Sequence, residues 1–266
     1  MSALISADEL DSRLGETGLK VFDIRGRWGE PPVAVKAEYE KGHIPGAVYL
    51  DWIETFLQPG VPIPEAAVVD KEGAARAFRE LGIRHDDTVV LYDDCSHIFA
   101  CRIWWSMKYW GFPEVRILDG GWSRWQALEY EVSTVKRKPA PGDFQPSATP
   151  CWLVTTDEVI QEKEECLLVD GRGEESFGKI RIPGSLSLPF HTLLQAETGL
   201  FKPKKALEEV FDSIGDWRIK PVISTCGAGY TASVVLFALQ ELGKQVPLYD
   251  GSLTIWRKQG HAVDRT

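Results

Sequence analysis

Short apolar runs alternate with helical patterns along most of the chain. In the second half, the stretches LLVDGR, PVISTC and PLYDG are short and apolar, which is typical of buried strands. Between the last two, TASVVLFALQELG has the pattern of a helix that Thr231 can begin and Gly243 can end. This helix is apolar on nearly every side, so we expect it to be buried against a sheet. The alternation predicts an α/β fold in which a mainly parallel sheet carries helices on both faces.

The two halves of the chain resemble each other in four stretches that occur in the same order. Such a repeat indicates a duplication, so we expect two similar α/β domains with a cleft between them. The expected domains are residues 1–135 and 151–266. The matching stretches are GLKVFDIRGRW and CLLVDGRGEESF, GHIPGAVYL and RIPGSLSLPF, DTVVLYDDCSHIFACRIWWSMKYWG and KPVISTCGAGYTASVVLFALQELG, and VRILDGGWSRW and VPLYDGSLTIW.

A segment without apolar periodicity separates the halves. Residues 136–150, KRKPAPGDFQPSATP, are rich in proline, glycine and polar side chains. This composition predicts a linker between the domains.

Net charge, apolar runs and cysteine spacing limit the kinds of partner and the cellular location that we expect for this protein. The net charge of −9 disfavours nonspecific attraction to nucleic acid or to an anionic membrane. No apolar run approaches the roughly 18 residues of a membrane span, and the first residues lack the pattern of a signal peptide. The five cysteines are odd in number and show no CxxC spacing, which argues against a disulfide framework and a zinc site. We therefore expect a cytoplasmic protein and, from its size, a monomer.

Cys226 stands at the start of CGAGYT, where a predicted strand passes through a tight loop into a predicted helix. Ligands of α/β sheets bind at the carboxyl ends of strands, and Gly227 and Gly229 let backbone approach a ligand closely. The N–H groups of the loop and of the helix start would then point into one concavity. A cysteine there is stabilised as the thiolate, which is the nucleophilic form, so we interpret Cys226 as reactive. The alternative is a buried, inert cysteine.

The loop argues against phosphatase chemistry. A phosphate dianion is best held by a bidentate guanidinium, and cysteine phosphatases carry an arginine at the end of a C-x5-R pattern. Here the corresponding residue is Ala232, so phosphate monoester hydrolysis is disfavoured. The absence of an adjacent histidine likewise disfavours Cys–His acyl transfer.

With these residues the chain resembles the tandem-domain rhodanese family, the group of thiosulfate and 3-mercaptopyruvate sulfurtransferases. In that family only the C-terminal domain carries the nucleophile. Asp94 aligns here with Cys226 and Ser96 with Ala228, so the first domain would be a scaffold. The resemblance rests on VFDIRGRW, GHIPGAVYLDW, VVLYDDCSHIFACRIWW, ILDGGWSRW, VDGR, RIPGSLSLPF, CGAGYTAS and LYDGSLTIW.

The resemblance implies a two-step transfer of sulfane sulfur. The Cys226 thiolate takes sulfur from a donor and becomes a persulfide, and a thiophilic acceptor then removes the outer sulfur. Cyanide, a thiol and a reduced thioredoxin-like protein are the acceptors it implies, and it implies no metal or organic cofactor. Thiosulfate-type loops of the family resemble CRKGVT, whereas mercaptopyruvate-type loops resemble CGSGVT. The neutral loop Cys226, Gly227, Ala228, Gly229, Tyr230 and Thr231 is closer to the second, so 3-mercaptopyruvate is the preferred donor.

Three further residues match substrate-binding positions of the family, each with a structural alternative, and a fourth is the nearest substitute for such a residue. Arg172 matches an arginine that anchors the anionic group of the donor, and its alternative is an ion pair at a strand end. Arg181 is the nearest substitute for a second arginine. Asp51 matches a carboxylate of the cleft, and its alternative is a polar residue at a strand end. Trp28 matches an aromatic residue of the cleft, and its alternative is core packing.

Two other functions stay open. The first is a thiosulfate sulfurtransferase, in which thiosulfate and not 3-mercaptopyruvate is the main sulfur donor. Ala228 replaces the serine that the family uses for activation, and it cannot donate or accept a hydrogen bond through its side chain. The chain could therefore be a rhodanese-like carrier of sulfur with little turnover.

Overall fold

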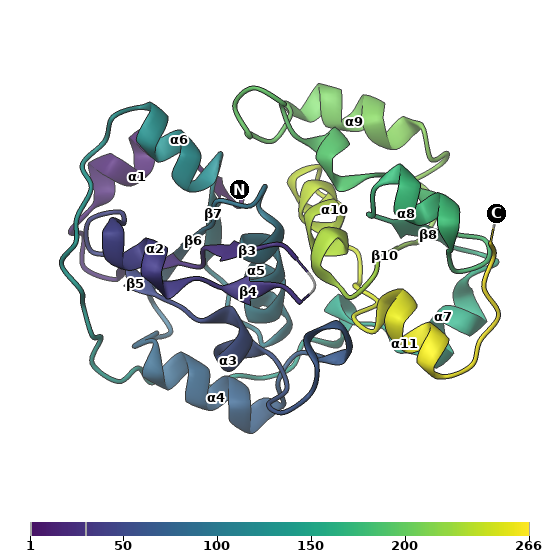
Figure 1. Cartoon of the computed structure of the whole chain (residues 1–266), viewed down its shortest axis with the longest axis horizontal. Coiled ribbons are helices and arrows are strands. Elements are labelled where there is room, and N and C mark those ends of the chain that lie inside the picture. The colour runs from purple at the N-terminus through teal and green to yellow at the C-terminus, as the bar shows by residue number, and fades with distance from the viewer. Residues whose placement is uncertain (1, 30, 266) are drawn as a thin grey trace. The chain divides into compact units, whose positions relative to one another are not determined.

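The computed structural model describes residues 2–29 and 31–265 and divides the chain into two compact units (Figure 1). Unit 1 contains Met1–Ile63 and Val68–Thr149, and unit 2 contains Pro64–Ala67 and Pro150–Thr266. Residues 64–67, which lie within the sequence of the first half, thus belong to the second unit. The sequence analysis does not predict this assignment. In the described part of the chain, no helix has the length and apolar character needed to cross a membrane.

The sheet of unit 1 is entirely parallel. Helices cover both of its faces, as the alternating pattern predicts. The core residues Leu10, Val90 and Trp125 cluster under α1 (Ala7–Arg13) and α6 (Gly121–Ala127). On the other face, α5 (Ile98–Tyr109) packs on the central strands. In spatial order the strands are β1 (Leu4–Ile5), β7 (Val115–Leu118), β6 (Thr88–Tyr92), β2 (Leu19–Asp23) and β5 (Val48–Tyr49).

The remaining elements of unit 1 are short and lie around this sheet (Figure 1). Two of the helices, α3 and α4, pack against each other, and α3 also contacts α5. The two short strands β3 and β4 pair with each other in antiparallel fashion, outside the main sheet. Their bounds are β3 (Gly26–Arg27), β4 (Val33–Ala34), α2 (Lys36–Lys41), α3 (Trp52–Phe56) and α4 (Lys71–Glu80). The short helix η1 (Ile63–Glu65) begins in unit 1 and ends in unit 2.

Unit 2 repeats the strand order of unit 1. Its parallel strands run β10 (Val222–Thr225), β8 (Leu167–Asp170) and β9 (Leu186–Ser187). Isolated parallel bridges place Leu248 beside Ser224 and Leu153 beside Leu248, which extends the sheet by two single-residue positions. The order 153, 248, β10, β8, β9 matches β1, β7, β6, β2, β5. Two α/β domains of the same topology are therefore confirmed.

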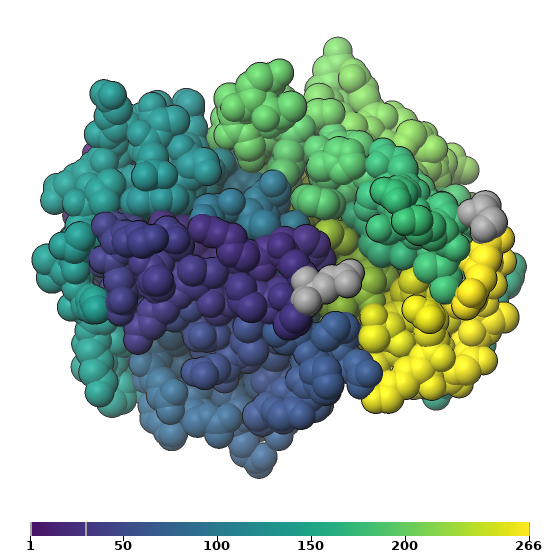
Figure 2. Space-filling view, viewed as in Figure 1, coloured from purple at the N-terminus to yellow at the C-terminus, as the bar shows by residue number. Residues whose placement is uncertain are grey.

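Helices also cover both faces of the second sheet. On one face α10 (Tyr230–Glu241) packs on β10 and against η3 (Phe190–Leu193), which also contacts α9 (Lys204–Asp212). On the other face, side chains of α7 (Thr156–Glu162) and α11 (Ser252–Lys258) enclose Leu168 and Ile223. Beyond α8 (Glu174–Lys179), Arg181 pairs with Asp264 in an antiparallel bridge, and Figure 2 shows this C-terminal segment in yellow on the surface. The short helix η2 (Pro150–Trp152) begins the main part of the unit.

The buried helix of the second half begins one residue earlier than the sequence predicts. It starts at Tyr230, not Thr231, because Gly229 adopts a left-handed conformation with φ of 83° and completes the turn before the helix. Its end agrees with the prediction, since Gly243 takes a left-handed φ of 83° beyond the last turn. All of its residues except Gln240 are buried, as expected for a helix apolar on nearly every side.

The segment predicted to be a linker is bound to unit 1. Residues 136–149 contain no helix or strand, but Gly142 donates a backbone hydrogen bond to Arg79 and Thr149 donates one to Tyr109. Phe144 is buried and packs against Phe78 and Phe112. Most of the segment therefore extends the core of unit 1, and the domain boundaries read from sequence stay predictions.

One buried ion pair recurs in both units at the end of the second strand. Arg25 donates to Asp23 through Nε (3.0 and 3.1 Å) and Nη2 (2.7 Å), and Arg172 donates to Asp170 with nearly the same geometry (3.0, 3.0 and 2.7 Å). Each guanidinium also reaches the chain that follows, at the carbonyl of Gly42 or Ile180. The pair ties the strand end to the next loop in each unit.

We expect the variant Arg25→Leu to lose about 3 kcal/mol of unfolding free energy, because the carboxyl group of Asp23 would be left buried without its cation. Asp23 is fully buried and Arg25 is 3% exposed. The matched control is Arg27→Leu, which breaks a surface pair with Asp94 and should cost at most about 1 kcal/mol. Urea unfolding followed by tryptophan fluorescence measures both, and equal losses would contradict the prediction.

Candidate active site

Cys226 lies at the carboxyl end of β10, in the loop that leads to α10. The residue is 2% exposed, so its thiol lies in the turn and not on the surface. The N–H of Gly229 donates a hydrogen bond to Sγ at 3.1 Å. This contact depends on the left-handed turn at Gly229, a conformation that strongly favours glycine. The strand, loop and helix predicted around the cysteine are present, with the sulfur facing a backbone donor.

Polar groups without partners surround the loop. The first N–H groups of an α-helix have no acceptor within the helix, and α10 begins three residues beyond Gly227. The hydroxyls of Thr225 and Thr231 are buried and have no hydrogen-bond partner among the described residues. Buried polar groups are normally satisfied, so these two hydroxyls are exceptions. Tyr230, the first residue of the helix, is buried beside them.

Unit 1 shows what the same turn does when it holds a negative charge. The carboxylate of Asp93 accepts hydrogen bonds from the N–H groups of Cys95 (3.0 Å) and His97 (3.1 Å) through Oδ1. Through Oδ2 it accepts from Phe99 and Ala100, both at 2.9 Å, at the start of α5. The loop and helix start of the first repeat are thus closed around an internal anion.

The sheet register corrects the alignment of this loop. Tyr92 pairs with Asp23 as Thr225 pairs with Asp170, so Asp93 takes the position of Cys226, and not Asp94. Counted back from the helix starts, Asp94 does match Cys226 and Ser96 does match Ala228. The two counts differ because the loop of unit 1 is one residue longer. Sequence comparison could not locate this extra residue without the strand register.

Arg172 is held by contacts that favour its structural alternative. Besides the pair with Asp170, it donates to the carbonyls of Ser176 (3.2 Å) and Ile180 (2.7 Å). The recurrence of this arrangement at Arg25 in unit 1 indicates a role in the fold. Its stem nevertheless lies beside the loop, since a Cβ added at Gly227 would be 3.8 Å from Cδ of Arg172.

The Arg181 side chain contacts Phe177 and Asp264. Its guanidinium carbon lies 5.3 Å from the ring centre of Phe177, and Nε lies 3.9 Å from a carboxylate oxygen of Asp264. Its backbone N–H and carbonyl pair with Asp264 as well. These contacts support a structural role and leave its predicted role in donor binding as a prediction.

Asp51 and Trp28 belong to unit 1. Asp51 caps α3, where its Oδ1 accepts from the N–H groups of Ile53 (3.0 Å) and Glu54 (3.2 Å), a structural role that the sequence analysis does not predict. Trp28 is 51% exposed and lies 6.3 Å from the ring of Phe99, so it is not a core residue. The cleft that both residues would line stays a prediction.

The first turn of α11 is a part of the site that sequence analysis missed. Ser252 accepts a hydrogen bond from the N–H of Cys226 at 3.1 Å, and Leu253 donates one to the carbonyl of Cys226 at 3.1 Å. Thr254 donates to the carbonyl of Gly227 through N (3.0 Å) and Oγ1 (2.8 Å). The signal was available in the repeat, where the first unit has Gly121 at the position of Ser252.

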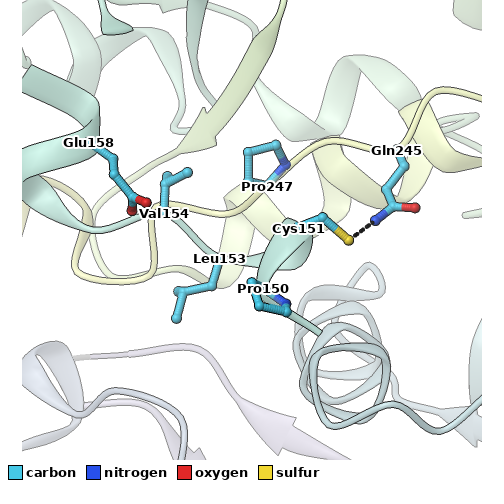
Figure 3. Close-up of a pocket in the computed structure, with 7 residues that line it drawn as sticks. All are labelled: Pro150, Cys151, Leu153, Val154, Glu158, Gln245 and Pro247. Carbon is cyan, nitrogen blue, oxygen red and sulfur yellow. Dashed lines mark hydrogen bonds between the residues drawn. The ribbon is translucent and has the colours of Figure 1, made fainter. Parts of the chain in front are cut away.

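A cavity of about 580 Å³ in unit 2 lies away from this loop (Figure 3). Its lining includes Cys151, whose sulfur accepts a hydrogen bond from the side chain of Gln245 at 2.8 Å, together with Glu158 and Pro247. Cys151 is exposed, in contrast to Cys101, Cys166 and Cys226, and all five cysteines are free. None of the predicted substrate-binding residues lines this cavity.

Comparison with known proteins agrees with the repeated fold. The Rhodanese-like domain matches residues 6–128 and 155–259. The 3-mercaptopyruvate sulfurtransferase of Escherichia coli is 31% identical over 95% of this chain and 94% of its own. The thiosulfate sulfurtransferase of Bos taurus is 31% identical over 90% of this chain and 85% of its own. The chain belongs to the rhodanese family, and the prediction of a sulfurtransferase is confirmed.

Solved structures support the same conclusion. SseA from Escherichia coli superposes with a TM-score of 0.86 at 30% identity, over 95% of this chain and 99% of that chain. EanB superposes with a TM-score of 0.85 at 22% identity, over 99% of this chain and 69% of that chain, which shows a shared fold alone.

We expect the cysteines to differ in their reaction with iodoacetamide near neutral pH. Burial raises the pKa of Cys166 to about 11 and the pKa of Cys95 to about 12, and it also raises the pKa of Cys101. Because the thiolate is the reactive form, these three should be labelled slowly, with rates that rise with pH. The exposed Cys151 should be labelled faster than these three. Peptide mass spectrometry measures each rate, and fast labelling of Cys95 or Cys166 would contradict the assignment.

Proposed function

We propose that Cys226 is the nucleophile of this sulfurtransferase. Its thiolate attacks the sulfane sulfur of the donor, a sulfur–sulfur bond forms, and the bond between that sulfur and the rest of the donor breaks. The electron pair leaves with the donor, and Cys226 carries a persulfide. A thiophilic acceptor such as cyanide or a thiol then attacks the outer sulfur, which restores the thiolate. Kinetics of the ping-pong type follow from the covalent intermediate.

The observation that carries this proposal is the pair of matching turns. At Asp93, the turn of unit 1 surrounds a negative charge with four backbone N–H groups. At Cys226, the corresponding turn of unit 2 has one N–H on the sulfur and unpaired threonine hydroxyls nearby. Fixed N–H dipoles stabilise charge without reorganising during the reaction. The same groups that hold a carboxylate in one repeat support a thiolate and a persulfide in the other.

We further propose that 3-mercaptopyruvate is the preferred donor. The loop at 226–231 contains no cation, and the guanidinium of Arg172 is already bound to Asp170. Thiosulfate is a dianion without carbon and depends most on cations close to the sulfur. A donor with a single carboxylate depends on them less. Relatives named for either donor have the same 31% identity to this chain, so identity does not separate the two.

In this proposal the substrate-binding residues keep secondary roles. The roles of Arg172, Arg181, Asp51 and Trp28 in donor binding, which the family resemblance implies, stay predictions. Thr231 donates its hydroxyl to the anion. Location in the cytoplasm, a thioredoxin-like acceptor and a monomeric state remain predictions.

A second candidate is a carrier of sulfur with little turnover. It is favoured by Ala228, whose methyl group cannot supply the proton transfer that a serine would. A thiosulfate sulfurtransferase is the third candidate. The three are distinguished by turnover with each donor and by the amount of persulfide on the isolated protein.

We expect Cys226→Ser to abolish sulfur transfer to cyanide with either donor and to leave the fold intact. A hydroxyl is a much weaker nucleophile than a thiolate at neutral pH. Cys151→Ser is the matched control, since it changes the exposed cysteine outside the loop, and it should retain full transfer. Intact mass of the wild type after incubation with donor should show one added sulfur, about 32 Da, which the Cys226 variant lacks. Transfer by Cys226→Ser would exclude the mechanism.

We expect Ala228→Ser to raise turnover with 3-mercaptopyruvate and to leave turnover with thiosulfate unchanged. The new hydroxyl would restore a hydrogen-bonding group next to the sulfur, and a positioned proton-transfer group contributes about a hundredfold at the low end of such effects. Steady-state kinetics with both donors, at fixed cyanide, measure the change. A gain with thiosulfate alone would instead favour the thiosulfate sulfurtransferase.

A further inference from the structure

The first turn of α11 forms hydrogen bonds with the loop of Cys226, and among the described residues only some of these bonds have an equivalent in unit 1. Three consecutive residues, Ser252, Leu253 and Thr254, bond to the backbone of Cys226 and Gly227. In unit 1 the equivalent helix α6 makes one of these contacts, between the N–H of Trp122 and the carbonyl of Asp93 at 2.8 Å. The contact of Leu253 is therefore common to both repeats, whereas the hydroxyl contacts belong to the catalytic repeat.

Ser252 occupies a position that glycine fills in the other repeat. Gly121 has a φ of 56° and begins α6, and Ser252 has a φ of 47° and begins α11. A Cβ at Gly121 would lie 2.3 Å from the carbonyl oxygen of Asp93, so unit 1 has no room for a side chain there. Unit 2 accommodates a serine in the same left-handed region, where residues with a Cβ are uncommon.

The hydroxyl of Ser252 explains this conformation. Ser252 is fully buried, and its Oγ donates to the carbonyl of Tyr249 at 2.7 Å while it accepts from the N–H of Cys226 at 3.1 Å. A strained backbone persists when the surrounding contacts determine it, and such strain is concentrated at functional sites. Here both contacts of the hydroxyl are used, and one of them is with the nucleophile's own peptide group.

We propose that Ser252 and Thr254 are positioning residues that fix the backbone of Cys226 and Gly227 and thereby aim Sγ at the N–H of Gly229. This inference rests on the proposed role of Cys226. The N–H of Cys226 is fixed by Ser252, its carbonyl by Leu253, and the next carbonyl by Thr254. With the peptide groups on both sides of the residue fixed, the direction of its Cα–Cβ bond is fixed as well. A sulfur placed in this way already accepts the hydrogen bond from the N–H of Gly229 before the reaction begins.

The contrast between the repeats supplies the first experiment. Ser252→Gly converts the catalytic repeat to the residue of the other repeat, removes the hydroxyl and relieves the left-handed strain. We expect kcat for sulfur transfer to fall about tenfold, as for the loss of one buried hydrogen bond, with KM within about twofold of the wild-type value. The urea midpoint of unfolding should change little, because the lost hydrogen bond and the relieved strain oppose each other.

Ser185→Ala is the matched control for this change. It also removes one buried serine hydroxyl of unit 2. This hydroxyl donates to the carbonyl of Ile182 at a distance of 2.7 Å, outside the loop of Cys226. We expect kcat to stay at the wild-type value. A wild-type kcat in Ser252→Gly would overturn the positioning role. So would equal falls of kcat in Ser252→Gly and Ser185→Ala, because a general loss of packing would then account for both.

Thr254 provides a test by rescue. Thr254→Val keeps the shape of the side chain and the backbone hydrogen bond to Gly227 but removes the hydrogen bond of the hydroxyl. We therefore expect kcat to fall about threefold to tenfold. Thr254→Ser restores the hydroxyl and should restore most of kcat. If the serine and valine variants have equal kcat, the hydroxyl of Thr254 has no positioning role.

The outcome for Cys226→Ser separates this inference from the proposed function. Transfer by Cys226→Ser would remove the nucleophile assignment and, with it, the reason for positioning this loop. An inactive Cys226→Ser together with a fully active Ser252→Gly would leave the nucleophile in place and overturn the positioning role alone.

Discussion

Both repeats depend on how backbone N–H groups are satisfied where a parallel strand turns into a buried helix. Four N–H groups at the start of a helix lack partners within the helix, and burial makes unsatisfied donors costly. In unit 1 the carboxylate of Asp93, the first residue after β6, accepts from two N–H groups of the helix start (Phe99 and Ala100) and from two of the loop (Cys95 and His97). Unit 2 places Cys226 at that position, where the N–H of Gly229 donates to Sγ. In the proposed mechanism, the two repeats therefore differ in the group that meets the N–H dipoles of this turn.

The surrounding packing keeps these turns rigid. The ion pair at the end of the second strand, Asp23 with Arg25 and Asp170 with Arg172, secures the neighbouring loop in both repeats. The start of α6 or α11 supports the turn from the other side, with the added hydroxyls of Ser252 and Thr254 in unit 2. A site that depends on the direction of a single sulfur atom needs such support, because small displacements weaken charge stabilisation strongly.

The proposed donor preference follows from the same electrostatics. With Arg172 bound to Asp170 and no lysine or arginine in the loop, the attraction for an anionic donor near Cys226 comes mainly from N–H dipoles and hydroxyls. Dipoles are weaker than full charges for a compact dianion, and they are adequate for a thiolate and a persulfide. The substitution of alanine at position 228 then limits proton transfer and not charge stabilisation. These two effects act at different steps, and kinetics with the two donors separate them.

Much of the protein could be predicted from sequence because the relevant signals are local or repeated. Apolar runs located β8 and β10, the all-apolar pattern located α10, and four repeated stretches revealed the duplication and the place of Cys226. Tertiary structure decided what depends on register and on distant contacts. Only the strand pairing showed that Asp93 replaces Cys226, because one extra loop residue shifts any sequence alignment there. Only packing showed that Arg172 is bound in an ion pair and that Ser252 reaches the N–H of Cys226, because residues distant in sequence meet through the sheet and not through any local pattern.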